Sequence, residues 1–331
     1  MKKIMRGVLL FGMLGGMLLS CGNKKEEKGS QTQAQTKSEE KVFKIGIGQI
    51  VDHPALNDAK QGFKDALNKA GVKAEFEETV ANGEMATQTL QMQQFLKSKK
   101  DLVYAITTPT SQAAKSQITD IPVVIAAVTD PKGAGLVGIS NITGTSGAAP
   151  TKENLEMMRK VFPDAKKIGI IYNSSEQNSV SEVKTLNELA KNYGFEVVEK
   201  AVTNGTELVS AANILVKDTD LYYAIQDNTV SSYFPTLLEI TDKHKIPVFA
   251  TNNVYTNRGG LISQGATDYE IGYRAGEIAV EILKNGKKPS EIPIETIKNL
   301  KIEINRKNME MLGIKIPEDV LKEAIFTEDK K

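Results

Sequence analysis

The stretch DLVYAITTPT at Asp101–Thr110 has a counterpart, DLYYAIQDNT, at Asp220–Thr229. In both copies an apolar run of strand length leads into a polar segment that can begin a helix. Both are followed by a further apolar run, IPVVIA at 121–126 and IPVFAT at 246–251. Strands that alternate with helices in this way form parallel sheets covered by helices on both faces. The repeat therefore predicts an α/β protein with two doubly wound lobes.

The same alternation extends outward from the two copies. Apolar runs predict strands at 42–51, 72–80 and 135–140 in the first half, and at 167–173 and 195–202 in the second. Helical spacing of apolar residues covers 56–70, 84–99, 151–162, 179–194, 205–215, 234–244 and 268–286. A body of roughly 285 residues is too large for one small core, which agrees with two domains.

The N-terminus has the pattern of an export signal. Lys2, Lys3 and Arg6 precede an apolar run at 8–19 that is too short to cross a membrane comfortably. LLSC at 18–21 then resembles the bacterial lipobox, which implies cleavage of residues 1–20 and a lipid on the sulfur of Cys21. An ordinary signal peptide with an incidental cysteine is the alternative. Residues 21–41 hold no large apolar side chain and predict a flexible tether.

Composition excludes several classes of function. Cys21 is the only cysteine and there are two histidines, so neither an internal disulfide nor a zinc cluster is expected. Removal of residues 1–20 would change the net charge from +1 to −2, which gives no reason to expect a nucleic-acid partner. No P-loop, G-x-S-x-G or H-E-x-x-H motif occurs, so we expect no cofactor, no metal and no catalytic activity.

Candidate binding residues follow from the predicted topology. In open parallel sheets, ligands bind beyond the carboxyl ends of the strands. Two lobes that present these ends to each other would enclose a polar cleft. Because Ser, Thr, Asn and Asp are also preferred helix caps, we expect about half of the candidates to be caps. The candidates are Gln49, His53, Thr107, Thr108, Ser111, Thr129, Asp130, Ser140, Asn141, Tyr172, Asn173, Glu176, Asn178, Asp227, Asn228 and Asn252.

Several long motifs, in order and without a large gap, resemble a known family. IGIGQIVDHPALNDAKQGFKDAL, AITTPTSQAA, IPVVIAAVTDPKGAGLV, IGIIYNSSEQNS and IPVFATN are similar to the tryptophan/tyrosine-type substrate-binding proteins of ABC transporters. The resemblance implies the type I periplasmic-binding-protein fold, with two Rossmann-like lobes and a three-crossover hinge. It assigns 43–144 plus 257–286 to one lobe and 145–256 plus 287–325 to the other.

The resemblance also implies a function. The chain would be a monomeric receptor outside the cytoplasm, in the periplasm or on the outer face, held to the membrane through Cys21. It would close on an aromatic amino acid (tryptophan, tyrosine or phenylalanine) and deliver it to a permease driven by an ATPase. Relatives tend to carry a carboxylate where this chain has Asn141, so the cargo stays open. A nucleoside, a flavin-like ring or a branched-chain amino acid are alternatives, and an extracytoplasmic enzyme is a more distant one.

The parts of an amino acid suggest roles for some candidates. Its ammonium needs a buried carboxylate, for which Asp227 is the first choice, ahead of Glu176 and Asp130. An aromatic side chain would need an apolar slot with a polar end, near Tyr172 and His53. Its carboxylate needs hydroxyls and N–H groups at helix N-termini, which could come from Thr107, Thr108 and Ser111 or from Ser174 and Asn178.

Overall fold

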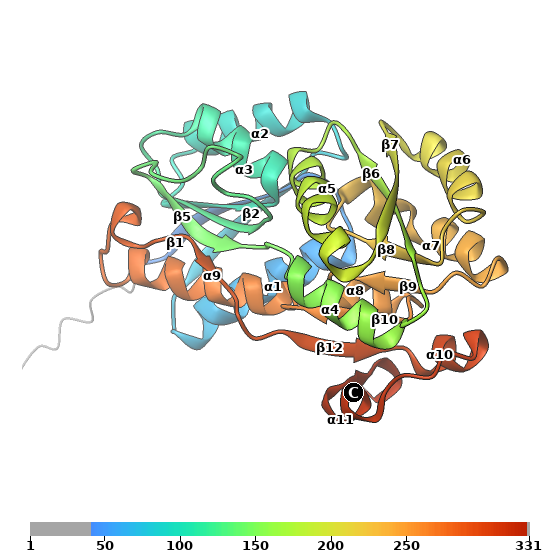
Figure 1. Ribbon diagram of the computed structural model, residues 1–331. Coiled ribbons are helices and arrows are strands. Elements are labelled where there is room, and N and C mark those ends of the chain that lie inside the picture. Colours follow the sequence, from blue (N-terminus) through green and yellow to red (C-terminus); the bar gives the residue numbers. More distant parts are fainter. Residues whose placement is uncertain (1–40, 330–331) are drawn as a thin grey trace, which may run out of the picture. The chain divides into compact units, whose positions relative to one another are not determined.

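The computed structural model describes residues 41–329, and Figure 1 shows their helices and strands. The predicted signal peptide, Cys21 and all but the last residue of the predicted tether lie outside the described residues. Within 41–329, no helix combines the length and the apolar character needed to cross a bilayer.

The first lobe is built on a six-stranded parallel sheet with the order β11-β5-β4-β3-β1-β2. Helices α1 and α9 cover one face of this sheet, and α2 and α3 cover the other (Figure 1). The elements of this lobe in its first, continuous segment are β1 (Phe43–Gln49), α1 (Pro54–Lys69), β2 (Ala74–Val80), α2 (Met85–Lys97), β3 (Leu102–Ile106), α3 (Thr108–Gln117), β4 (Val123–Val128) and β5 (Ile142–Ser146).

The second lobe is built on a seven-stranded sheet with the order β13-β12-β10-β9-β8-β6-β7. Its neighbours run parallel except for β10 and β12, which are antiparallel. Helices α4, α5, α10 and α11 contribute to the core on one face, and α6, α7 and α8 to the core on the other. Its elements up to the end of β10 are α4 (Thr151–Val161), β6 (Lys167–Asn173), α5 (Gln177–Ala190), η1 (Lys191–Tyr193), β7 (Glu196–Val202), α6 (Gly205–Leu215), β8 (Leu221–Ala224), α7 (Asn228–Lys243), β9 (Val248–Ala250), α8 (Asn253–Asn257) and β10 (Ile262–Gly265).

The chain passes between the two sheets at three places. It leaves the first sheet after β5, returns after β10 to form α9 and β11, and leaves again before β12. These three connections form a hinge, which lets the two lobes rotate relative to each other without unfolding. The last elements are α9 (Asp268–Leu283), η2 (Pro289–Glu291), β11 (Glu295–Thr296), β12 (Lys301–Ile304), α10 (Arg306–Leu312), α11 (Glu318–Glu323), β13 (Ile325–Phe326) and η3 (Thr327–Asp329).

The central strand β3 shows why the lobes need helices on both faces. All its residues are buried: Leu102, Tyr104 and Ile106 belong to the core beneath α1 and α9, and Val103 and Ala105 to the core beneath α2 and α3. Side chains alternate between the faces of a strand, so an uninterrupted apolar run is stable only when both faces are covered. The apolar run at 102–106 thus forms a central strand of the lobe.

The predicted strand at 135–140 is wrong. Gly135 and Gly138 have φ values of +68° and +81°, which a strand does not accommodate, and the segment forms turns. The strand starts later, at Ile142. The side-chain amide of Asn141 ties the turn before this strand to the connection between α3 and β4, because it donates to the carbonyls of Ile118 and Ile121 at 3.0 Å each.

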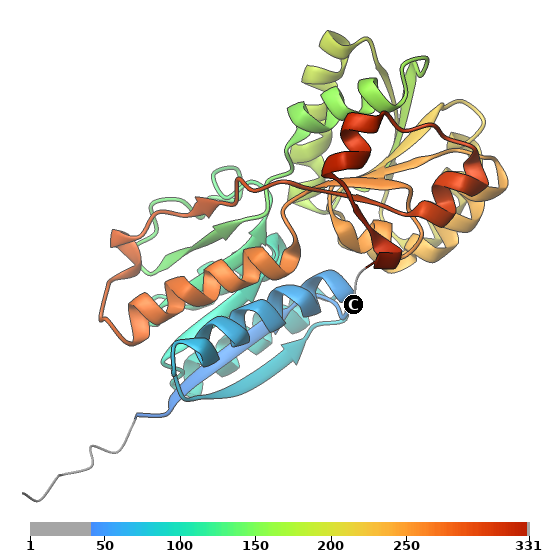
Figure 2. The same cartoon turned by 90° about the horizontal axis from the view of Figure 1, so that it is seen from below.

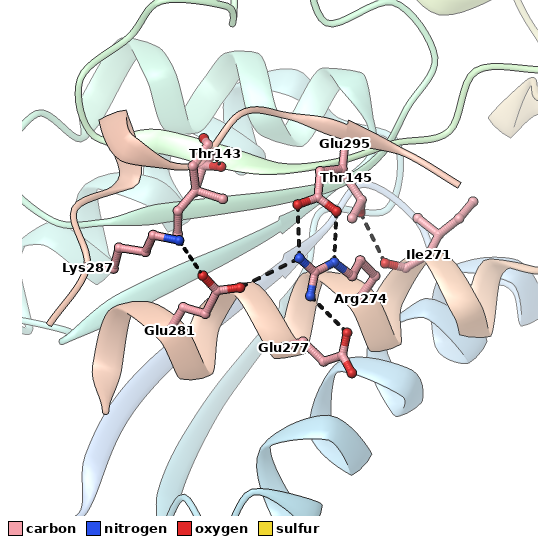
Figure 3. Close-up of polar contacts among 9 residues, drawn as sticks. Thr143, Thr145, Ile271, Arg274, Glu277, Glu281, Lys287 and Glu295 are labelled. Carbon is pink, nitrogen blue, oxygen red and sulfur yellow. Dashed lines mark hydrogen bonds and ion pairs between the residues drawn. The ribbon is translucent and has the colours of Figure 1, made fainter. Parts of the chain in front are cut away.

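The sheet pairing also corrects the predicted lobe boundaries at three segments. Thr145 and Ser146 were expected in the second lobe but belong to β5 and pair with β11 in the first sheet. Ile262–Gly265 was expected in the first lobe but pairs with β9 and β12 in the second sheet. Glu295–Thr296 was expected in the second lobe but pairs with β5 in the first sheet. Figure 3 shows what holds this short strand: Arg274 of α9 makes two hydrogen bonds of 2.8 and 2.9 Å to the carboxylate of Glu295.

Candidate functional site

A cavity lies between the carboxyl ends of the strands of the two sheets. The space inside it is small, about 40 Å³, which holds a few water molecules. Both lobes contribute to its wall, as do the segments next to the second crossover. The lining residues are His53, Ala55, Leu56, Thr107, Thr108, Ala127, Thr129, Asn178, Gln226, Asp227, Asn228, Ser231, Asn252, Tyr255 and Asp268.

Helix N-termini converge on this cavity. Helices α1, α3, α7 and α9 begin at or next to lining residues, with His53, Thr107, Asp227 and Thr267 as their N-caps. Pro54 and Pro109 lie in the first turns of α1 and α3, where a missing N–H costs nothing. The N-terminus of a helix carries a partial positive charge and free N–H groups. The cavity is therefore suited to a ligand with an anionic group.

Two lining residues have strained backbone. Thr107 has a φ of +81° at the end of β3, and Ala127 has a φ of +54° inside β4. The register between β4 and β5 shifts between Ile125 and Val128, so Ala127 lies in a bulge. Side chains with a Cβ are uncommon in this region, and such strain concentrates at ligand sites.

Several buried polar atoms of the wall lack a partner. Within residues 41–329, no hydrogen-bond partner is in place for Thr107 Oγ1, Thr108 Oγ1, Asn178 Oδ1 or Asp268 Oδ2. Leaving a buried polar atom unpaired costs about 1–3 kcal/mol. Four such unpaired atoms border one cavity, which indicates a site for a polar ligand.

His53 is a neutral group on the wall. Burial lowers the pKa of its imidazole to about 4, so at pH 7 the ring offers one donor and one acceptor. Neither ring nitrogen has a well-formed hydrogen bond in the described chain, although Asn228 lies near enough to favour the charged form.

Two buried carboxyl groups, Asp227 and Asp268, line the cavity, and other buried carboxyl groups lie close to Asp227. Burial raises the pKa of Asp268 to about 7, and Asp58 shifts it further in the same direction. Burial raises the pKa of Glu182 to about 8, with a further contribution from Asp227. Burial and the neighbouring Glu176 also raise the pKa of Asp227. The interior therefore disfavours additional negative charge at these positions unless a cation is supplied.

Half of the predicted site residues line the cavity. These are His53, Thr107, Thr108, Thr129, Asn178, Asp227, Asn228 and Asn252. Asp227 and Asn252 are also N-caps, since their side chains accept hydrogen bonds from the N–H groups of Val230 and Val254. Cap and wall are thus not exclusive roles at these positions.

The other predicted residues lie outside the wall. Gln49 is buried and bonded to Asn57, and Ser111 donates to the carbonyl of Thr107. Ser140 is exposed, Asn141 donates to the carbonyl of Ile118, and Tyr172 packs against the core of the second lobe. Of the remaining three, Asp130 accepts from Gly133 and Ser181, Asn173 donates to Thr229, and Glu176 accepts from Asn228 and Thr229.

The sequence analysis did not select Gln226, Ser231, Tyr255 or Asp268, which also line the cavity. Asp268 follows β10, so the rule that ligands bind beyond strand ends points to it directly.

Side chains bridge the two lobes beside the cavity. Ser181 of α5 donates to the carboxylate of Asp130, which follows β4, at 2.9 Å. Thr129 donates to the side-chain oxygen of Gln226 at 3.4 Å. These two hydrogen bonds join the lobes beside the cavity and form only when the lobes are close together.

Comparison with known proteins decides the family. The family model described as "ABC transporter substrate binding protein" matches residues 44–327. The chain belongs to the ABC transporter substrate-binding proteins. The family consists of receptors that act outside the cytoplasm and are not enzymes, and its two-lobed architecture is the type I periplasmic-binding-protein fold.

This substrate-binding protein has relatives with described ligands. It is 36% identical to the tyrosine-binding protein of Clostridioides difficile, over 100% of this chain and 98% of the relative. It is also similar to a structure from Streptococcus pneumonia in complex with L-Trp, with 33% identity, a TM-score of 0.81, and coverage of 85% of this chain and 99% of the other.

A third comparison bears on the arrangement of the lobes. The ligand-free, open structure of a Clostridium difficile substrate-binding protein with adhesive properties is 38% identical, covers 86% of this chain and 99% of its own, and has a TM-score of 0.67. Its identity is higher than that of the tryptophan complex, but its structural similarity is lower. The lobes of this substrate-binding protein are therefore arranged more as in the ligand complex than as in the open form.

Proposed function

We propose that this protein is the lipid-anchored receptor of an ABC importer and binds an aromatic amino acid in the cavity between its lobes. The observation that carries the proposal is the cavity itself, in which unpaired polar atoms, strained backbone and helix N-termini meet. The tyrosine-binding and tryptophan-bound relatives support this class of cargo.

The wall has separate regions for the parts of such a ligand. The N-terminus of α3, with the free hydroxyls of Thr107 and Thr108, suits the carboxylate. Leu56 and Tyr255 offer apolar surface for a ring, and His53 offers a neutral polar edge.

Ligand binding would be coupled to closure. A ligand that touches both lobes stabilises the closed form by its differential affinity for that form. The contacts Asp130–Ser181 and Thr129–Gln226 would add to that stabilisation. A permease would then recognise the closed monomer, and an ATPase would supply the energy.

Anchoring rests on the sequence of the N-terminus. The lipobox-like LLSC, preceded by a basic and apolar segment, supports lipidation at Cys21 after removal of residues 1–20. A tether through residue 41 would keep the receptor near its permease.

The test of cargo is direct. Mass spectrometry of small molecules released from denatured purified protein should detect tryptophan, tyrosine or phenylalanine. The chain contains no tryptophan, so bound L-tryptophan would be the sole indole and its emission should shift to the blue. Recovery of a nucleoside or a branched-chain amino acid, with no binding of the aromatic ones in calorimetry, would overturn the proposed cargo.

A further inference from the structure

Helices α1 and α9 pack unusually closely. A Cβ on Gly272 would lie 1.9 Å from the carbonyl oxygen of Ala59, and a Cβ on Gly62 would lie 2.2 Å from that of Tyr269. Gly276 meets Phe63 in the same way. Gly272 meets Ala59 and Gly276 meets Phe63, one turn further along both helices, so the two helices run parallel, as Figure 2 shows in blue and orange. Their N-termini therefore lie at the same end, beside the cavity.

Asp268 is the first residue of α9, and the helix does not need its carboxylate. The capping box is completed by Thr267 and Glu270, whose side chains bond each other's backbone N–H groups. Further along, Arg274 ties α9 to Glu295 of β11 and also pairs with Glu277 and Glu281 of its own helix (Figure 3). The position of α9 is thus fixed by groups other than Asp268.

The carboxylate of Asp268 is 4% exposed and lies on the cavity wall. Its Oδ2 has no hydrogen-bond partner, and none of the ion pairs within residues 41–329 includes it. An acceptor in this position requires a donor from the ligand, and a cationic donor gains most because it also offsets the buried charge.

Asp227, the first choice from sequence, is satisfied within its own lobe. Its carboxylate accepts from the N–H groups of Asn173 and Val230 and from the hydroxyl of Ser179, at 2.6 to 2.8 Å. Glu176 likewise accepts from Asn228 and Thr229. Among these carboxylates, Asp268 is the one with an unused oxygen at the cavity.

We propose that Asp268 binds the ammonium group of the ligand, so that this receptor requires a free primary amine. The proposal deepens the proposed function and rests on it for the identity of the ligand. The carboxylate of the same ligand would point to the N-terminus of α3, where Thr107 and Thr108 carry unpaired hydroxyls.

The test compares ligands with and without the amine. Calorimetry would measure affinities of L-tryptophan, L-tyrosine, L-phenylalanine and L-leucine beside their desamino acids, such as 3-(indol-3-yl)propionate and 4-methylpentanoate. For the wild type we expect the amine to strengthen binding at least about 30-fold. In Asp268→Asn we expect that advantage to fall to within about threefold, with the desamino acid bound as by the wild type.

A matched variant separates binding from folding. Glu270→Gln alters the first turn of the same helix but lies outside the cavity, so it should keep the full advantage of the amine. Thermal melting of both variants checks that they fold, and the ratio of affinities is a readout that a merely structural role would not change.

The outcomes are distinguishable. If Asp268→Asn keeps the wild-type ratio, or weakens both members of a pair equally, the proposal is overturned. If the wild type binds only leucine, the aromatic cargo is wrong while the leucine pair still tests Asp268. If no amine-bearing ligand binds better than its desamino acid, the role of Asp268 is excluded whatever the cargo.

Discussion

Ser181 and Asp130 lie in different lobes and are joined by a hydrogen bond of 2.9 Å from the serine hydroxyl to the carboxylate. The bond exists only in the closed arrangement, so Ser181→Ala should destabilise that arrangement and weaken ligand binding. A hydrogen bond to a charged group contributes about 1.5–3 kcal/mol, and we expect a loss of roughly tenfold or more in affinity. Calorimetry measures the affinity, and small-angle scattering the fraction of open molecules. Ser210→Ala, an exposed serine bonded only within its own helix, is the control. Equal affinities of the Ser181 variant and wild type would contradict the role.

Ligand affinity should depend on pH through Asp268. Its pKa of about 7 in the empty site means that a proton must leave before the carboxylate can pair with an ammonium. Affinity should therefore rise with pH up to about 7 and level off above it, with a slope approaching tenfold per unit on the acid side. Asp58 and the buried Tyr104 are the ionisable groups that act on Asp268, and the pKa of Tyr104 is raised so that it stays neutral. Calorimetry from pH 5.5 to 8.5 checks this, and a flat profile for the wild type would exclude it. The ligand affinity of Asp268→Asn should depend less on pH than that of the wild type.

Glu182 should make the empty protein less stable at alkaline pH. Its pKa is about 8 in the folded chain and about 4.3 in an unfolded one, so the unfolded state releases its proton first as the pH rises. This contribution to the free energy of unfolding is present below about pH 4.5 and is lost as the pH rises toward 8. Glu182→Gln removes the penalty and should stabilise the protein by on the order of 2 kcal/mol at pH 8, with little change at pH 5. Denaturant unfolding measures the difference. Glu188→Gln, exposed on the same helix, should show no such dependence.

Thr107 should lower the stability of the fold through its strained backbone and strengthen ligand binding through its hydroxyl. Glycine adopts a φ of +81° without strain, so Thr107→Gly should relieve the backbone by up to about 1 kcal/mol, while it removes a hydroxyl from the cavity. We expect an equal or higher melting temperature together with weaker ligand binding. Lys99 has a φ of +50° at an exposed turn, and Lys99→Gly should relieve strain without affecting the ligand. A Thr107 variant that binds normally would show that the strain has another origin.

Much of the fold could be predicted because local signals and topology agree. The repeated stretch at 101–110 and 220–229 places β3 and β8 with the helices that follow them, and half of the residues selected at strand ends line the cavity. The predictions that failed concern which segments form strands and which strands pair with each other. Apolar residues at 135–140 suggested a strand, but the two positive φ values at glycine depend on the turn that the complete lobe imposes. β11 has two residues and pairs with Thr145 and Ser146 of β5, which lie far from it in sequence. Asp268 differs from these cases, since it follows β10 and the rule that ligands bind beyond strand ends would have selected it.

Helix α9 also has a consequence for biosynthesis. It completes the first lobe, covering Ala59 and Phe63 of α1, yet the ribosome makes it after β6 to β10 of the second lobe. A nascent chain that ends before Leu283 therefore exposes an apolar surface that nothing else in the first lobe covers. Such surfaces promote aggregation and are recognised by chaperones. The lobe that emerges first is the last to be finished, which favours a chain that is exported before it folds.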